Sequence, residues 1–302
     1  ALQRAELVIV QEAFAGTETL AYADIVLPAA TWPEKSGTVT NSERRISRVR
    51  AAIAPPGDAQ PDWRLACAVA QRLAERLAPE KAALFDYADE SAVFAEHART
   101  TAGRDLDYSA LDYAALEAAG PQQWPYARHG TARLYAEGVY PTATGRARFL
   151  DVGYAPPAET VSAEYPIRLT TGRLRDHWHT MARTSLAPAL TRHAEEPALS
   201  LHPADMDRLQ LADGALARVK SRRGQVVLPA RADDTLRPGH AFLPMHWGSA
   251  FIAGDGVNAL TNPARDPLSR QPELKHTAVS VAPARLRWQA VAWVRGDAVA
   301  WR

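Results

Sequence analysis

The sequence predicts a mixed fold class, an α/β unit followed by a compact β-barrel, within its 302 residues. Two short apolar runs in the first 32 residues flank a helical stretch, which is the strand–helix–strand order of a doubly wound α/β sheet. Beyond Tyr165 the pattern changes to short alternating strands with glycine turns and short helices, which is typical of small barrels. These observations place one domain at residues 1–158, a second at 159–288 and a tail at 289–302.

The first domain opens with apolar runs at residues 6–12 and 25–32. Short continuous apolar runs of this kind predict parallel strands that are buried on both faces. Ligands of such sheets bind beyond the carboxyl ends of the strands, which here carry Gln11 and Glu12, then Glu34 and Lys35. We therefore expect a ligand at these strand ends.

A helix is predicted by "PDWRLACAVAQRLAERLAPEK", which Asp62 is expected to cap and Pro79 to end. Cys67 lies within it and reads as a small buried or half-buried thiol. One apolar face is indicated by four residues spaced four apart: Leu65, Val69, Leu73 and Leu77.

The rest of the first domain is less regular. The charged stretch at residues 32–50 reads as a solvated loop, apart from Lys35. Residues 89–100 predict a second helix. Residues 103–158 are rich in glycine, proline, tyrosine and alanine, and predict loops and short elements that join the two domains.

The second domain alternates strands with turns. Strands are predicted at "YPIRLTTG", "AFLPMHW" and "AVSVAPARL", and a short helix at "HPADMDRLQL". "ALARVKS" and "QVVLPARA" form a hairpin around the turn "SRRG". The irregular stretch 256–275 reads as a functional loop. The tail "RWQAVAWVRGDAVAWR" is either a last strand or a docking segment.

Composition excludes several classes of function. Lysine and arginine total 35 against 34 acidic residues, so the chain lacks the positive charge that bulk nucleic-acid binding requires. Its one cysteine excludes an internal disulfide framework and a cysteine-based metal or iron–sulfur site within these residues. No run of about 18 apolar residues predicts a membrane span. The N-terminus enters a strand almost at once and reads as a piece of a longer chain.

The densest cluster of polar donors is "TTGRLRDHWHT", residues 170–180. His177 and His179 allow a metal pair, and a polar turn packed against the barrel is a second interpretation. The third is anion capture, in which Gly172 frees backbone N–H groups and Arg173 and Arg175 bind phosphate oxygens. A flat phosphorylated cofactor would use the arginines, the rings and the glycine turn together.

Several segments, in this order, resemble the C-terminal part of the catalytic subunit of molybdopterin-dependent nitrate reductases, within the dimethyl-sulfoxide-reductase-like family. The combination of "TGRLRDHWHTMART" with "GPQQWP" is most similar to the assimilatory, cytoplasmic branch. The other segments are "ADIVLPAATWPEKSGTVTNSERR", "PPGDAQPDW", "HPADMDRLQLADG", "SRRGQV" and "VNALTNPARDPLSRQPELK".

The resemblance implies the end of an α/β cofactor domain followed by a double-psi β-barrel. It implies a molybdenum bis(molybdopterin guanine dinucleotide) cofactor and reduction of nitrate to nitrite in nitrate assimilation. It also implies a 4Fe-4S cluster in an N-terminal part outside this chain. The electron donor would be ferredoxin, flavodoxin or an NAD(P)H-linked reductase subunit, in the cytoplasm, without nucleic-acid or membrane partners.

The same resemblance assigns site residues. Gln11 and Glu12 would meet a guanosine, with Lys35 and Asp62 as further cofactor contacts and Asn258 and Lys275 at the second cofactor region. Met245, His246 and Trp247 match a substrate-funnel position, while no residue here matches a catalytic or metal-ligating one, Cys67 included. The main pterin-and-phosphate loop would be Thr171, Gly172, Arg173, Leu174, Arg175, Asp176, His177, Trp178, His179 and Thr180.

Two alternatives remain open from the sequence. One is another molybdopterin oxidoreductase such as formate dehydrogenase, since the metal ligand that separates these enzymes is expected in the N-terminal half. The other is a noncatalytic cofactor-binding module.

Overall fold

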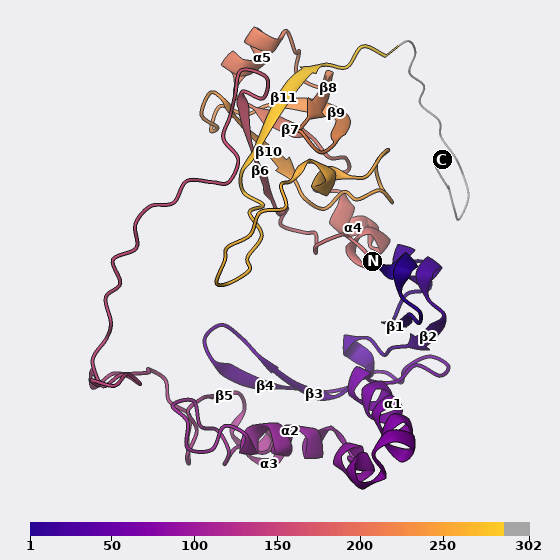
Figure 1. Ribbon diagram of the computed structural model, residues 1–302, viewed down its shortest axis with the longest axis vertical. Helices are drawn as coiled ribbons and strands as arrows, with labels where there is room; N and C mark the ends of the chain where they lie inside the picture. The colour runs from indigo at the N-terminus through magenta and orange to yellow at the C-terminus, as the bar shows by residue number, and fades with distance from the viewer. Residues whose placement is uncertain (287–302) are drawn as a thin grey trace. The chain divides into compact units, whose positions relative to one another are not determined.

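The computed structural model describes residues 1–286 and divides the chain into two compact units, the first ending at Asp151 and the second beginning at Val152 (Figure 1). The predicted tail at 289–302 lies outside the described residues. A mixed α/β fold with a closed six-stranded barrel is confirmed.

The first unit opens with a two-stranded parallel sheet. β1 (Ile9–Glu12) pairs with β2 (Ile25–Pro28), and the 3-10 helix η2 (Glu18–Tyr22) connects them. Parallel pairing is confirmed, but the expected burial on both faces is wrong. Ile9, Ile25 and Val26 are 44%, 44% and 48% exposed. A sheet of only two strands leaves both edges and much of both faces uncovered.

A hairpin occupies much of the stretch that the sequence predicted as a charged loop. β3 (Gly37–Thr40) and β4 (Arg45–Val49) are antiparallel, and β5 (Gln122–Gln123) extends them to three strands. Helices α2 (Glu90–Arg99) and α3 (Tyr113–Ala119) pack with this sheet. Their shared core contains Ile46, Phe94, Ala98, Tyr108, Leu111 and Leu116. Arg48 lies on the same face of β4 as the buried Ile46, with its guanidinium carbon 3.5 Å from the centroid of the Tyr113 ring, so this strand shows no apolar alternation in the sequence.

The long helix α1 (Asp62–Leu77) is confirmed, and the 3-10 helix η4 (Pro79–Phe85) follows it. The predicted cap is wrong, because Pro61 is the N-cap and Asp62 is already helical, its carboxylate bonded to Lys35. The apolar face is only partly covered within this chain. Leu73 and Leu77 are 54% and 79% exposed.

The second unit is the predicted barrel. Six strands close in the order β10-β6-β11-β8-β9-β7, with parallel pairs β10–β6 and β7–β9. The closure leaves no free sheet edge among these six strands. The strands are β6 (Ile167–Gly172), β7 (Leu199–Leu201), β8 (Leu216–Lys220), β9 (Gln225–Ala232), β10 (His240–Pro244) and β11 (Thr277–Pro283).

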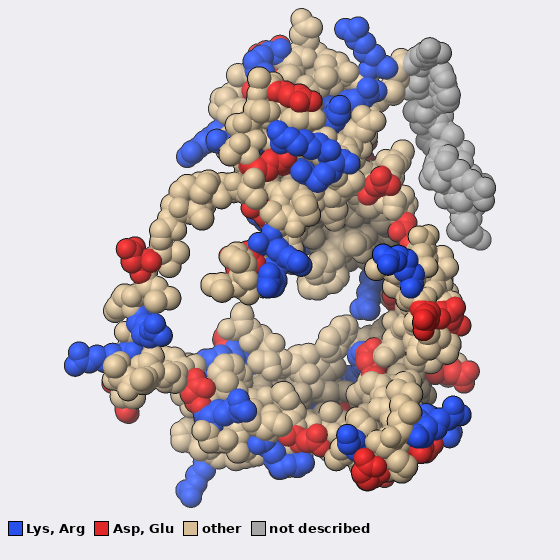
Figure 2. All heavy atoms as spheres, in the orientation of Figure 1, with Lys and Arg blue, Asp and Glu red and all other residues tan. Residues whose placement is uncertain are grey.

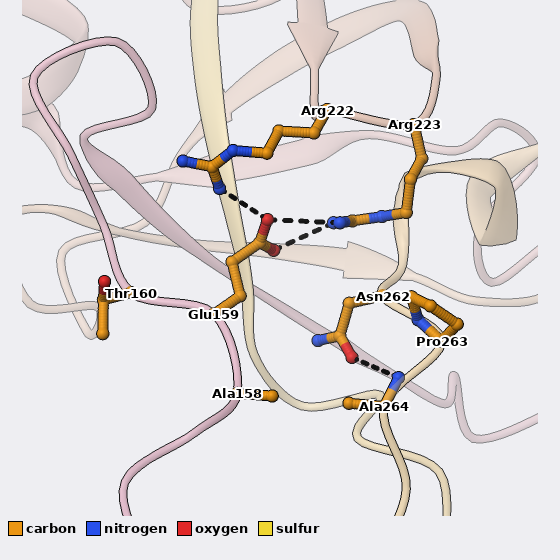
Figure 3. A pocket seen from close by; sticks show the side chains of 8 residues that line it. All are labelled: Ala158, Glu159, Thr160, Arg222, Arg223, Asn262, Pro263 and Ala264. Atoms are coloured by element: carbon orange, nitrogen blue, oxygen red, sulfur yellow. Dashed lines mark hydrogen bonds and ion pairs between the residues drawn. The ribbon is translucent and has the colours of Figure 1, made fainter.

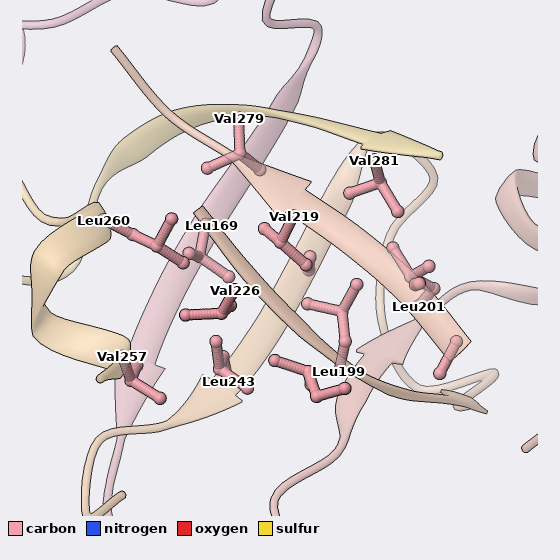
Figure 4. Packing of buried hydrophobic residues seen from close by; sticks show 14 of the residues in the cluster. Leu169, Leu199, Leu201, Val219, Val226, Leu243, Val257, Leu260, Val279 and Val281 are labelled. Carbon is pink, nitrogen blue, oxygen red and sulfur yellow. The ribbon is translucent and has the colours of Figure 1, made fainter. Parts of the chain in front are cut away.

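Leucine and valine side chains from these strands meet inside the barrel (Figure 4). Leu169, Leu199 and Leu201 are fully buried, as are Val219 and Leu243. Alternate residues of each strand point inward, so the period-two patterns of the sequence predicted this core correctly. The sequence analysis missed β7, which has only three residues.

Short helices connect the strands. α5 (Pro203–Leu209) starts at His202, whose Nδ1 accepts the N–H of Ala204. The others are η5 (Thr184–Leu186), α4 (Pro188–Thr191) and η6 (Val257–Leu260). Among residues 1–286, no helix has both the length and the apolar character needed to cross a membrane.

Candidate functional site

The loop after β6 begins at Gly172, where a neighbouring side chain leaves no room for a Cβ atom. A Cβ atom at Gly172 would lie 2.5 Å from the ring of Phe242, so a larger residue would push that ring away. Thr171 is buried, and its hydroxyl donates to the carbonyl of Leu274 at 2.7 Å. The Nζ of Lys275 donates to the carbonyl of Thr171 at 2.6 Å. The start of the loop is therefore tied to Lys275, as the assignment of both residues to one site requires.

The two arginines of this loop differ in their partners. Arg175 forms a two-pronged ion pair with Asp176, both N–O distances being 2.9 Å, and these bonds hold the pKa of Asp176 below its usual value. Arg173 is exposed, and no carboxylate pairs with it in the described chain. Lysines, arginines and acidic residues are interspersed on the face drawn in Figure 2. What distinguishes Arg173 is that its guanidinium has no carboxylate partner among the described residues and lies beside the ring of Trp178.

Trp178 is exposed next to this free cation. The residue is 60% exposed, and the guanidinium carbon of Arg173 lies 5.4 Å from the centroid of its ring. The backbone makes this possible, since His179 and Met181 have φ values of 40° and 60° and the chain turns sharply. Met181 is buried by this turn while Trp178 and Thr180 stay outside. An exposed indole beside an unpaired guanidinium is suited to a flat, anionic ligand.

Beneath the loop lie residues that follow β10. His246 is fully buried; its Nε2 is 2.8 Å from the amide of Leu174 and its Nδ1 is 2.6 Å from the carbonyl of His179. Trp247 is 5% exposed and meets the ring of His177 edge-on at 5.8 Å. The amide of Met245 donates to the carbonyl of Gly172 at 2.9 Å. His246 and Trp247 thus support the loop from below, and the predicted substrate role of these residues stays a prediction.

The ring of His177 is buried beside those of His246 and Trp247. It is 6% exposed, and its Nδ1 is 3.1 Å from the hydroxyl of Thr184. His179, by contrast, is exposed, so the two histidines do not share a face as a metal pair would. Residues 1–286 contain no group of three histidine, cysteine or acidic side chains that could hold a metal ion.

Asn258 lies in η6 and is exposed. η6 starts beside Trp247, since the amide of Val257 donates to the carbonyl of Trp247 at 3.0 Å. Asn258, Lys275 and the loop therefore belong to connected parts of the barrel, although no bond joins Asn258 to the loop in the described residues.

The first unit has its own cluster of predicted residues. Lys35 and Asp62, named separately by the resemblance, form an ion pair 2.5 Å long. They line a cavity of about 230 Å³ together with Trp32 and Trp63. Lys35 also lies 5.4 Å from the centroid of Trp32. The cavity combines two aromatic rings with a cation and a carboxylate.

Gln11 and Glu12 end β1, as predicted. Gln11 is exposed. One carboxylate oxygen of Glu12 accepts the amides of Ala13 and Phe14 at 2.7 and 3.2 Å, which fixes the direction of the side chain. Such an anchored carboxylate can still accept hydrogen bonds at its second oxygen.

The barrel unit also contains a buried ion-pair cluster that was not predicted from the sequence (Figure 3). Glu159 is 9% exposed and accepts bonds from Arg222 at 2.7 Å and Arg223 at 2.9 Å, and from the amide of Ala278 at 3.1 Å. Burial alone would raise the pKa of Glu159, but the arginine bonds outweigh it and lower the pKa to about 2. The adjacent cavity of about 580 Å³ also includes Asn262.

This cluster anchors the chain and does not form an open anion site. Arg223 also donates to the carbonyl of Leu260 at 3.1 Å, so its charge and its donors are satisfied. The only sequence signal was the pair of consecutive arginines in "SRRG", which we interpreted as a hairpin turn.

Two family models match the chain, the molybdopterin oxidoreductase model at residues 1–72 and the molydopterin dinucleotide binding domain at residues 167–278. A nitrate reductase of Klebsiella oxytoca is 40% identical over 297 residues, which are 96% of this chain and 33% of that protein. The chain belongs to the molybdopterin oxidoreductases. The resemblance found in the sequence motifs is thereby confirmed.

Other relatives of this molybdopterin oxidoreductase chain carry different names. A formate dehydrogenase subunit alpha of Methanocaldococcus jannaschii is 35% identical, over 93% of this chain and 40% of that subunit. The solved structure of acetylene hydratase from Pelobacter acetylenicus matches with a TM-score of 0.67 at 18% identity, covering 94% of this chain and 41% of that one. At this identity the match shows the fold alone. The chain spans 33–40% of the length of the two sequence relatives named here.

Proposed function

We propose that this chain is the cofactor-holding C-terminal portion of a nitrate reductase and binds a molybdenum bis(molybdopterin guanine dinucleotide). The observation that carries the proposal is Arg173, an exposed cation without an acidic partner among the described residues, beside the exposed ring of Trp178. Guanidinium groups bind phosphate oxygens in a two-pronged way, and indole rings stack on flat heterocycles. Both residues lie inside the segment that the dinucleotide-binding model matches.

The remaining donors suit the same ligand. The free oxygen of Glu12 can accept the edge N–H groups of a guanine, and Gln11 adds an amide beside it. Lys35, Asp62 and the two tryptophans of their cavity offer a polar and aromatic surface. Lys275 and Asn258 add donors next to the barrel loop. We assign all of them to holding and orienting the cofactor, and none to catalysis or to the metal.

The bound molybdenum group would supply the two-electron reduction of nitrate to nitrite. A 4Fe-4S cluster, a cytoplasmic location and an electron donor such as ferredoxin, flavodoxin or an NAD(P)H-linked subunit are proposed for the whole protein. The double-psi topology of the barrel is likewise a proposal, which the parallel pairs β10–β6 and β7–β9 support.

Substitution of Arg173 in the full-length protein tests the proposal. Arg173→Ala should lower molybdenum and GMP content about tenfold or more, because a hydrogen bond from a charged group contributes roughly 1.5–3 kcal/mol. Nitrate reduction should fall in proportion. Arg218→Ala, at another exposed arginine of the barrel, is the matched control. Full metal content with full turnover in the Arg173 variant would remove the basis of the proposal.

Formate oxidation is the second candidate, because a formate dehydrogenase subunit is nearly as similar to this chain as the nitrate reductases are. The residues that hold the cofactor would be the same in a nitrate reductase and in a formate dehydrogenase. Assays of the full-length protein with nitrate and a reduced dye, and with formate and an oxidised dye, separate them.

A further inference from the structure

We infer that His246 is the positioning residue that holds the cofactor loop, residues 172–181, in its binding conformation. The inference rests on the proposed function for the ligand of that loop, and on geometry alone for the loop itself. His246 is fully buried, so it positions the loop without reaching a ligand outside it.

The two ring nitrogens of His246 bind opposite ends of the loop. The amide of Leu174 donates to Nε2 at 2.8 Å, and Nδ1 lies 2.6 Å from the carbonyl oxygen of His179. A carbonyl oxygen only accepts, so Nδ1 carries the hydrogen; an amide only donates, so Nε2 carries none. The geometry therefore requires the neutral Nδ1–H form of the ring. One ring thus joins two points five residues apart and closes the loop.

The bonded positions are next to the residues that would meet the ligand. Leu174 follows Arg173, and His179 follows Trp178. Fixing the amide of Leu174 and the carbonyl of His179 fixes the backbone from which the guanidinium and the indole extend. The left-handed φ of 40° at His179 is sustained by the same bond.

His246 is itself held on both sides. The amide of Met245 bonds the carbonyl of Gly172, and the carbonyl of Trp247 accepts the amide of Val257. A Cβ atom at Gly256 would lie 2.7 Å from the Cα of Gly248, so the chain after Trp247 is packed closely as well. Because the residues on both sides of His246 are fixed in this way, its ring can fix the position of the loop.

A second proton on His246 would break the arrangement. It would have to sit on Nε2, where the Leu174 N–H already points. Three groups of the loop disfavour a second proton on the ring by their charge: His177, at 5.6 Å between ring centroids, Arg173 and His179. Trp247 lies next to the ring, at 6.1 Å between centroids, and in η5 the neutral hydroxyl of Thr184 is hydrogen-bonded to His177. No carboxylate in the described chain is positioned to stabilise an imidazolium there, since Asp176 is bonded to Arg175.

Three substitutions in the full-length holoprotein separate the two bonds. His246→Gln places an oxygen near Nε2 and keeps the Leu174 bond, His246→Asn places an amide donor near Nδ1 and keeps the His179 bond, and His246→Leu removes both. His202→Leu is the matched control, because His202 also accepts a backbone N–H in the barrel but does not touch the loop. The readouts are the rate of tryptic cleavage after Arg173, divided by the rate for a synthetic peptide of residues 170–180 at the same pH, and the GMP released per chain on acid hydrolysis, each for protein held at about pH 8 and about pH 5.

Wild-type protein and His202→Leu should resist cleavage at about pH 8, whereas His246→Leu should be cleaved about tenfold faster or more and retain little GMP. His246→Gln and His246→Asn should fall between them. Wild-type protein should lose protection towards about pH 5, and His246→Leu should show no such pH dependence. Equal protection and equal GMP in His246→Leu and wild type would overturn the inference. Lost protection with full GMP would support the loop clamp and count against the proposed cofactor role of the loop.

Discussion

The Nζ of Lys35 lies 2.5 Å from the carboxylate of Asp62, although the two residues are 27 positions apart in the chain. The pair joins the segment after β2 to the first turn of α1, and the ammonium is the less exposed partner at 22% against 56%. Because one side of the pair faces solvent, its contribution to stability is small, in the range of about 0–1 kcal/mol. Its position beside Trp32 and Trp63 gives it a different importance, as part of a cavity wall.

We therefore expect Lys35→Met to affect cofactor content more than folding. In the full-length protein the unfolding midpoint in urea should shift little, while the GMP content should fall clearly below wild type. Arg72→Met, which breaks the exposed pair of Arg72 with Glu75, is the control and should leave GMP content unchanged. A large loss of stability with normal GMP would show that the pair serves folding instead.

Gly172→Ala should destabilise the barrel by about 1 kcal/mol, the lower end of the usual cost of overpacking, because the ring of Phe242 is only half-buried and can move. The cause is the 2.5 Å approach of the added Cβ to the ring of Phe242. Chemical denaturation measures the change. Gly172→Ala combined with Phe242→Leu should recover part of the lost stability, because the smaller side chain removes the clash. No recovery would mean that glycine is needed at 172 for another reason.

Stability should depend on the ionisation of Glu159. Its pKa in the folded protein is about 2, below the ordinary 4.5, so its contribution is present above pH 4.5 and is lost as the pH falls towards 2. The difference corresponds to roughly 3 kcal/mol. Urea denaturation at about pH 6 and about pH 3 should show roughly 2 kcal/mol of this loss in wild type and much less of it in Glu159→Gln. Glu195→Gln, at an exposed glutamate, should behave like wild type.

Cys67 should react slowly with iodoacetamide. Partial burial in α1 raises the pKa of its thiol, which lowers the fraction of thiolate at neutral pH. Mass spectrometry should show slower alkylation in the folded protein than in the urea-denatured chain. Equal rates in the two states would contradict the half-buried position.

Much of the fold followed from local pattern. The sequence predicted α1, α2, α5 and five of the six barrel strands. Their apolar residues recur with a period of 3.6 or 2, and this pattern can be seen in neighbouring residues alone. β7 was missed because three residues carry too little pattern, and the β3–β4 hairpin because Arg48 takes an inward position of β4, against Tyr113, and removes the apolar alternation. The expected burial of β1 and β2 failed for a different reason, since burial depends on what covers a strand and not on the strand's own apolar residues.

The candidate site, too, was predicted only in part from the sequence. Arg173 and Trp178 were identified by residue type alone, because a dense set of donors after a glycine turn is unusual at any position in a chain. The sequence also determined the family, through motifs whose order is preserved over most of its length. It did not show that Asp176 neutralises Arg175, that Lys35 meets Asp62, or that His246 holds the loop from beneath. These contacts join residues that are remote in sequence, or depend on the direction in which a side chain points. Only the packing of the folded chain decides them.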